Sequence, residues 1–190
     1  MSQILDAMRA GTLLADGALG SYIFELTGRL SETNHVYEAF NADRPEIIRD
    51  AYLAYLNAGS RCLTTNTFGA NDACLAGYGM AGRSGELSSA GVSVARETID
   101  EFARTNGCGV DDYFVLGSVG PTPAGDESPE SLTDIYAAQL RALVEGGVDA
   151  LLLETFRSVE LLRGVLAEVA RLDPGLPIIA QMALNRDGGA

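Results

Sequence analysis

Five short, nearly continuous apolar runs alternate with longer segments of helical periodicity along the 190-residue chain. Continuous apolar runs, as opposed to alternating ones, are typical of strands that are covered on both faces. A chain in which such strands alternate with helices is predicted to form a parallel sheet with right-handed crossovers. The predicted strands cover residues 12–15, 61–65, 113–117, 150–153 and 177–182.

The segments between these runs predict four helices with one apolar face each. Proline at the first helical position and glycine just beyond the last one are typical boundaries. The predicted helices begin at Pro45, shortly before Leu87, at Pro129 and near Ser158. Both an open doubly wound sheet and a (βα)8 barrel fit this order of elements.

Every apolar run ends in a short polar or glycine-rich cluster. In a parallel barrel the carboxyl ends of all strands meet on one face, which is where barrel enzymes place their chemistry. Five such clusters in succession favour a TIM-barrel-type α/β fold with a ligand site at the strand ends. The clusters lie at residues 16–20, 65–69, 117–121, 154–156 and 185–187.

Each cluster also has a purely structural explanation. Asp16 followed by Gly17 is a common turn. Glu154 directly follows a buried run, so its carboxylate needs a partner, either a cationic ligand or Arg157. The amides of 117–121 suit an anion, but glycines there also permit a tight turn. The G-x-G-x-x-G match at 77–82 has no preceding strand, so we interpret it as a link between helices.

Composition excludes several classes of function. The net charge is −13 and all 13 basic residues are arginines, so a nucleic-acid partner is not expected. Without lysine, Schiff-base and P-loop chemistry are excluded within these residues. His35 is the single histidine, and no G-x-S-x-G elbow is present, which argues against a Ser-His-Asp hydrolase. No apolar run is long enough for a membrane span, and no secretory signal is recognised, so a cytoplasmic protein is expected.

Cys62, Cys74 and Cys108 are widely spaced and odd in number. They match neither a disulfide framework nor a C-x-x-C metal site. Free thiols are therefore expected, and neither metal ligands nor catalytic residues are assigned within the chain.

Four blocks, in order, resemble the homocysteine S-methyltransferase family, which includes the homocysteine domain of cobalamin-dependent methionine synthase and betaine–homocysteine methyltransferase. The first is the D-G-A-L-G stretch at 16–20. The second joins P-E-I-I at 45–48 to T-N-T-F-G-A-N at 65–71. G-S-V-G-P at 117–121 and G-V-D through E-T-F at 147–156 complete the set.

This resemblance implies a (βα)8 barrel that binds L-homocysteine at the strand ends and methylates its thiol to make methionine. It implies substrate-binding roles for eight residues. Asp16 and Glu154 would face the amino-acid end of homocysteine, with Glu154 pairing its ammonium. The amides of Ala18 and Leu19, with the polar end at Ser118, would receive its carboxylate. Asn66 and Thr67 would shape the pocket wall. The full set is Asp16, Gly17, Ala18, Leu19, Asn66, Thr67, Ser118 and Glu154.

The family also implies a zinc ion held by three cysteines, but its zinc cysteines lie on later strands. The cysteines of this chain do not match those positions. We therefore expect residues 1–190 to form the N-terminal portion of an incomplete barrel, truncated after about the fifth strand and inactive alone. The alternative is a non-catalytic truncated barrel that self-associates, as a homo-oligomer, or completes a partner. The methyl donor, and any downstream folate, cobalamin or reductase module, cannot be read from the sequence.

Overall fold

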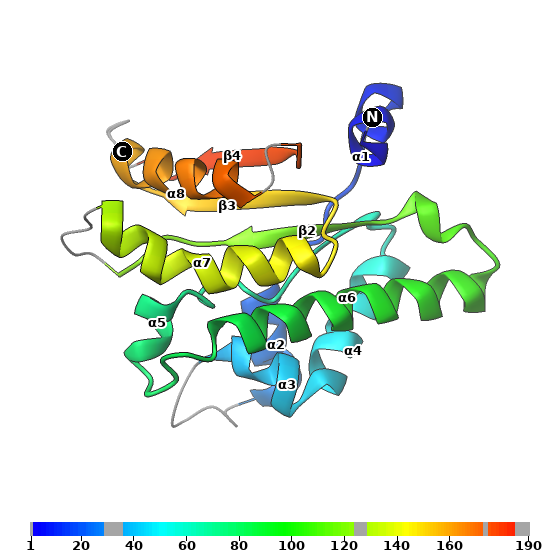
Figure 1. The fold of residues 1–190 in the computed structure, drawn as a ribbon. Helices are drawn as coiled ribbons and strands as arrows, with labels where there is room; N and C mark the ends of the chain where they lie inside the picture. Colours follow the sequence, from blue (N-terminus) through cyan, green and yellow to red (C-terminus); the bar gives the residue numbers. More distant parts are fainter. Residues whose placement is uncertain (1, 29–35, 124–128, 173–174, 185–190) are drawn as a thin grey trace.

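The structure, a computed structural model, describes residues 2–28, 36–123, 129–172 and 175–184. Its centre is a parallel sheet of four strands in the order β1-β2-β3-β4, shown in Figure 1. The strands are β1 (Cys62–Thr64), β2 (Phe114–Val119), β3 (Ala150–Phe156) and β4 (Ile178–Met182). These are the second to fifth predicted strands, so the prediction of a parallel α/β fold is confirmed.

The crossover helices lie between consecutive strands, and their starts follow the sequence signals. Pro45 occupies the first turn of α4, and Gly107 ends α6 in a left-handed conformation. Among the described residues, no helix is both long and apolar enough to cross a membrane. The helices are α1 (Gln3–Ala10), α2 (Leu19–Thr27), α3 (Phe40–Asp43), α4 (Pro45–Asn57), α5 (Asp72–Ala76), α6 (Ser84–Asn106), α7 (Pro129–Glu145) and α8 (Val159–Leu172).

The two faces of the sheet pack against different partners. Leu63, Val115 and Leu151 point to one face and join a large core with the apolar sides of α4, α6, α7 and α8. Phe114 and Leu152 point to the other face and form a smaller cluster with Ile4 of α1. Successive side chains of a strand alternate between faces, so even-numbered positions from β1 through Glu154 share this second face. Figure 1 shows α6, α7 and α8 together on the helical side.

The first predicted strand, residues 12–15, is the exception. It contributes one parallel bridge, between Ala15 and Cys62, instead of a strand. In a longer strand pairing, the amide of Thr64 would be the next to donate to the backbone of the N-terminal segment. It donates instead to the side chain of Asp16 at 2.7 Å. Because this side chain occupies the amide, backbone pairing stops there and the chain turns into α2.

Replacing Leu151 with alanine tests the position of the core. Leu151 is fully buried in the central strand β3. Its truncation should lower the free energy of unfolding by about 2–5 kcal/mol, as is usual for leucine cavities. Urea denaturation of the purified chain measures this. The matched control, Leu26→Ala, alters a leucine that is 46% exposed and should change stability far less. Equal losses in both variants would contradict this packing.

Candidate functional site

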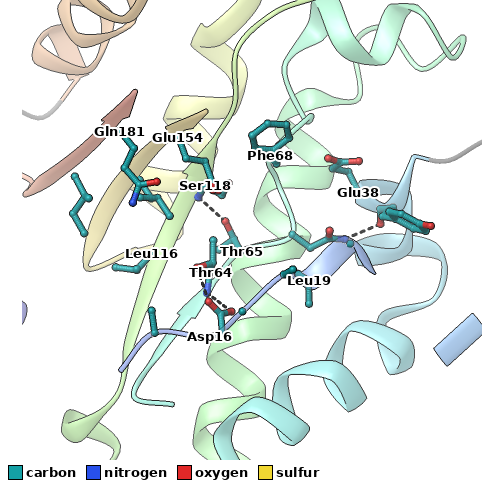
Figure 2. A pocket seen from close by; sticks show the side chains of 18 residues that line it. Asp16, Leu19, Glu38, Thr64, Thr65, Phe68, Leu116, Ser118, Glu154 and Gln181 are labelled. Carbon is teal, nitrogen blue, oxygen red and sulfur yellow. Dashed lines mark hydrogen bonds between the residues drawn. The ribbon is translucent and has the colours of Figure 1, made fainter. Parts of the chain in front are cut away.

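A cleft of about 580 Å³ opens at the carboxyl ends of β1, β2 and β3, on the face opposite the large helical core (Figure 2). Segments that are far apart in the sequence line it. Its wall comprises Ala15, Asp16, Gly17, Ala18, Leu19, Gly20, Tyr37, Glu38, Thr64, Thr65, Asn66, Phe68, Leu116, Ser118, Leu152, Glu154, Ile179 and Gln181. Seven of the eight predicted site residues are in this wall, and the exception is Thr67.

Asp16 joins the N-terminal segment to β1 and faces the cleft. Its Oδ2 accepts the Thr64 amide at 2.7 Å, and its Oδ1 accepts the Thr64 hydroxyl at 2.7 Å. Burial raises the pKa of Asp16 to about 6 despite the lowering effect of the Thr64 hydrogen bonds, and the nearby carboxylate of Glu154 makes a smaller contribution in the same direction. The two carboxylates therefore repel one another electrostatically within a single cleft.

Glu154 faces the cleft, as Leu152 does two residues earlier, and lies at an irregularity in β3. Leu153 pairs with Ala180, but the next pair is Phe156 with Met182. Two residues of β3, Glu154 and Thr155, therefore lie opposite one residue of β4. Thr155 has φ 66°, which is unusual for a β-branched residue. Such bulges redirect side chains next to functional sites.

Ser118 holds the Glu154 carboxylate. Its hydroxyl donates to Glu154 Oε1 at 2.6 Å, and its amide donates to the hydroxyl of Thr65 at 3.0 Å. Both donors of Ser118 are thus engaged within the protein. This differs from the expectation that Ser118 receives a substrate carboxylate, because neither donor is left for it. The geometry makes Ser118 a positioning residue for Glu154.

The start of α2 forms another part of the wall. Its N-cap residue, Ala18, has no side-chain oxygen to satisfy the first helical amides. Space at the neighbouring turn favours glycine, since a Cβ at Gly17 would lie 3.1 Å from the ring of Tyr55. The Tyr55 hydroxyl donates to the Ala18 carbonyl at 3.2 Å and fixes the turn. Uncapped amides at a helix start suit a carboxylate ligand.

Asn66 and Thr67 follow β1 and have different roles. The Asn66 amide group donates to the carbonyl of Tyr37 and to the side chain of Asn41, so this wall residue is rigidly held. Thr67 is fully buried, and its hydroxyl donates to the carbonyl of Ser118 at 2.7 Å. It does not line the cleft. The prediction for Thr67 thus placed it on the wrong side of the strand-end turn.

The cleft also contains residues that the sequence patterns did not single out as site residues. Glu38 lies in a short 3-10 helix, η2 (Tyr37–Ala39), where no periodicity or strand end marks it. Phe68 was part of a quoted motif but carried no predicted role. Gln181 lies on β4, inside a run interpreted only as core. It faces the cleft together with Ile179, two residues earlier on β4, and lies beside Glu154 in Figure 2.

The cysteines do not converge. Cys62 begins β1, Cys74 lies in α5 against the carbonyl of Pro121, and Cys108 contacts the hydroxyl of Tyr113. Burial and the charge of Asp16 raise the pKa of Cys62 to about 11, which favours the thiol. Within the described part of the chain, no group of three histidine, cysteine or acidic residues could hold a metal ion.

The remaining residues considered in the sequence do not contribute to the described cleft. Residues 77–82 link α5 to α6, as interpreted from the sequence, and do not line the cleft. His35 and the last predicted cluster, 185–187, lie outside the described residues. Arg157, the structural partner considered for Glu154, takes part in none of the ion pairs found among the described residues.

A parallel sheet with crossover helices and a polar cleft at its strand ends defines the class of α/β proteins that bind small ligands at that edge. Within this class, the family model of homocysteine S-methyltransferases matches residues 13–189. The chain belongs to the homocysteine S-methyltransferase family, as its four sequence blocks predicted.

Two curated relatives are methionine synthases. The chain is 27% identical to that of Mycobacterium tuberculosis, over 98% of its own length and 16% of the relative. It is 28% identical to that of Mycobacterium leprae, over 81% of its length and 13% of the relative. The chain therefore spans about one sixth or less of these proteins.

Solved structures of the homocysteine methyltransferase MmuM from Escherichia coli have the same fold. The metallated form matches with a TM-score of 0.83 at 23% identity, over 96% of this chain and 67% of that one. The oxidized form matches with a TM-score of 0.81 at 26% identity, over 95% and 66%.

The raised pKa of Asp16 is directly measurable. We expect the carboxyl carbon of Asp16 to titrate near pH 6 in NMR spectra, assigned by its loss in Asp16→Asn. Glu154→Gln should lower this pKa, because it removes a neighbouring negative charge. Since the folded state binds the proton more tightly than the unfolded chain, the contribution of Asp16 to stability is complete below about pH 3.8 and is lost as pH rises through about 6. A midpoint near 3.8 in both proteins would refute the shared cleft.

Proposed function

We propose that this chain supplies the amino-acid-binding part of a homocysteine S-methyltransferase, in which a methyl group is transferred to the thiol of L-homocysteine to make methionine. One observation carries the proposal. Two carboxylates, Asp16 and Glu154, share a cleft whose described lining contains no basic side chain, and the uncapped start of α2 lies in the same wall. A cleft with these features complements an α-amino acid, which carries both an ammonium and a carboxylate.

The ammonium of homocysteine would lie against Glu154. This carboxylate is held by Ser118 and forms no ion pair among the described residues, so it is oriented yet electrostatically unsatisfied. Charge-assisted hydrogen bonds to an ammonium are stronger than neutral ones. Asp16 would reinforce the negative potential and, as the ammonium enters, its raised pKa would fall.

The substrate carboxylate would lie at the start of α2, where the amides of Ala18 and Leu19 are available. The positive end of the helix dipole favours an anion there. Gly17 permits the turn that presents these amides, and Asn66 shapes the wall beside them. With the ammonium and the carboxylate of the amino acid both held, the side-chain thiol is oriented toward the remainder of the cleft.

The chemical step balances simply. The sulfur of the deprotonated thiol donates an electron pair to the methyl carbon and forms the new S–C bond. The bond between that carbon and the donor breaks, and its electron pair stays with the donor. The contribution of this chain is orientation, since fixed geometry lowers the barrier by holding the thiol in position for attack.

The zinc ion that the family resemblance implies does not fit the described residues. Their three cysteines are separated, and the pKa values of Cys62 and Cys74 are raised by burial, whereas a metal ligand must be a thiolate. No step is therefore derived through zinc. We propose that the metal, a complete (βα)8 barrel and the activation of the thiol all require residues other than these 190.

The alternative function is that of a non-catalytic module that self-associates or completes a partner's barrel. The observation in its favour is the edge strand β4, which pairs only with β3 in the described sheet and has exposed residues such as Ile178 and Gln181. An open edge with apolar exposure is a template for pairing with another strand.

Replacing Glu154 with glutamine tests the amino-acid site. The amide oxygen can still accept from Ser118, but the negative charge is lost. Homocysteine affinity should fall by about 1.5–3 kcal/mol, or roughly 10- to 150-fold. Isothermal titration calorimetry of the purified variant and the unaltered chain measures it. The matched control, Glu145→Gln, removes the same charge from an exposed position outside the cleft and should leave affinity unchanged. Similar affinity in all three proteins would remove Glu154 from the site.

We also expect the 190-residue chain alone to hold no stoichiometric zinc and to form no methionine from homocysteine. A catalytic zinc needs three protein ligands with one open position, and the described residues do not bring such a set together. Elemental analysis and a methionine-formation assay test this, with a complete family member as positive control. Bound zinc with turnover would show that the metal site has been misplaced. An inactive chain that binds homocysteine supports the proposed function, whereas an inactive oligomer without homocysteine affinity supports the module.

A further inference from the structure

The backbone of Ser118 is held by two buried threonines of the loop after β1. Its N–H donates to the hydroxyl of Thr65 at 3.0 Å, a bond drawn in Figure 2, and its carbonyl accepts the hydroxyl of Thr67 at 2.7 Å. The two threonine hydroxyls lie 2.6 Å apart. Thr65 is 2% exposed and Thr67 is fully buried, so these three hydrogen bonds form a ring that is shielded from solvent.

The direction of each hydrogen bond in this ring is fixed. A carbonyl can only accept, so the single hydroxyl proton of Thr67 points to the carbonyl of Ser118. Thr65 must therefore donate its own proton to Thr67, and a lone pair of the Thr65 oxygen faces the Ser118 amide. Because both hydroxyl protons are used within the ring, neither threonine is left to donate to a ligand. Removal of either hydroxyl would leave buried polar groups unpaired.

Gln139 ties this ring to helix α7. Its Nε2 donates to the carbonyl of Thr67 at 2.6 Å and to the carbonyl of Ser118 at 3.4 Å. The side chain is fully buried, yet its Oε1 has no hydrogen-bond partner among the described residues. A buried acceptor without a partner costs free energy. Gln139 is therefore better explained by the strand ends that it fixes than by a gain in stability.

We propose that Thr65 is a positioning residue for Glu154 that acts through Ser118, and that Thr67 and Gln139 hold Thr65 in the required orientation. The inference rests on the proposed function, in which Glu154 is the partner of the homocysteine ammonium. The hydroxyl of Ser118 donates to Glu154 Oε1 at 2.6 Å, so a shift of the Ser118 backbone displaces the carboxylate. A carboxylate that is fixed before the ligand arrives loses less conformational entropy on binding. The ring thus preorganises the cleft from its buried side.

Replacing Thr65 with valine tests this role, because valine has nearly the shape of threonine without its hydroxyl. Homocysteine affinity, measured by isothermal titration calorimetry, should fall about fivefold, and Thr65→Ser should restore it to within about twofold. The matched control is Thr98→Val. Thr98 is 1% exposed, and its hydroxyl donates to the carbonyl of Val94 at 2.6 Å within α6, outside the cleft. This control should lower stability in urea and leave homocysteine affinity unchanged.

A double-mutant cycle with Ser118→Ala shows whether Thr65 acts through Ser118. Ser118→Ala removes the hydroxyl that holds Glu154, so Thr65→Val should cause little further loss of affinity in that background. Losses that multiply in the double variant would overturn the proposal. Unchanged affinity in Thr65→Val, or an equal loss in Thr98→Val, would also overturn it.

NMR separates this inference from the proposed function. The signal of the Glu154 carboxyl carbon, assigned by its loss in Glu154→Gln, should shift in Thr65→Val, return in Thr65→Ser and stay unchanged in Thr98→Val. If the unaltered chain does not bind homocysteine while this signal responds as expected, the amino-acid proposal fails and the positioning role stands. An unchanged Glu154 signal in Thr65→Val contradicts the positioning role, whatever the affinities are.

Discussion

The parallel pairing of β1, β2 and β3 is the constraint on which the site depends. The register places Thr64 opposite Leu116 and Ser118 opposite Leu152, so residues that are 52 and 34 positions apart in the sequence become neighbours. Side-chain alternation then sends the odd-numbered residues into the helical core and the even-numbered ones toward the cleft. A slip of one residue in any strand would exchange the two sets.

The polar contacts at the strand ends form one connected system. Asp16 takes the Thr64 amide that would otherwise continue the ladder, and this ends the N-terminal strand after one bridge. The hydroxyl of Thr65 accepts the amide of Ser118, and the hydroxyl of Ser118 donates to Glu154, so Glu154 is held in a similar way. The two carboxylates that would touch a ligand are thus held by a backbone amide and by hydroxyl groups of neighbouring strands, which is the form of support that precise sites require.

Much of this architecture follows from sequence pattern. Near-continuous apolar runs located four of the strands within a few residues, because strands covered on both faces must be apolar throughout. The same logic failed for residues 12–15, where the deciding event is a side-chain hydrogen bond made across 48 positions. It also failed for Thr67, because a strand-end motif does not specify which of its side chains are buried and which line the cleft. It did not identify Glu38, because a 3-10 helix of three residues has no hydrophobic periodicity.

The charges of the cleft limit what it can bind. Asp16, Glu38 and Glu154 approach it from three separate elements, and its described lining includes no arginine or histidine to neutralise them. Burial raises the pKa of Asp16 and of Glu38, because enclosure in the protein disfavours the charged carboxylate. A cationic ligand can relieve the repulsion among these carboxylates, whereas an anion can approach only where the start of α2 offers uncapped amides. An amino acid, with its ammonium and its carboxylate, meets both conditions.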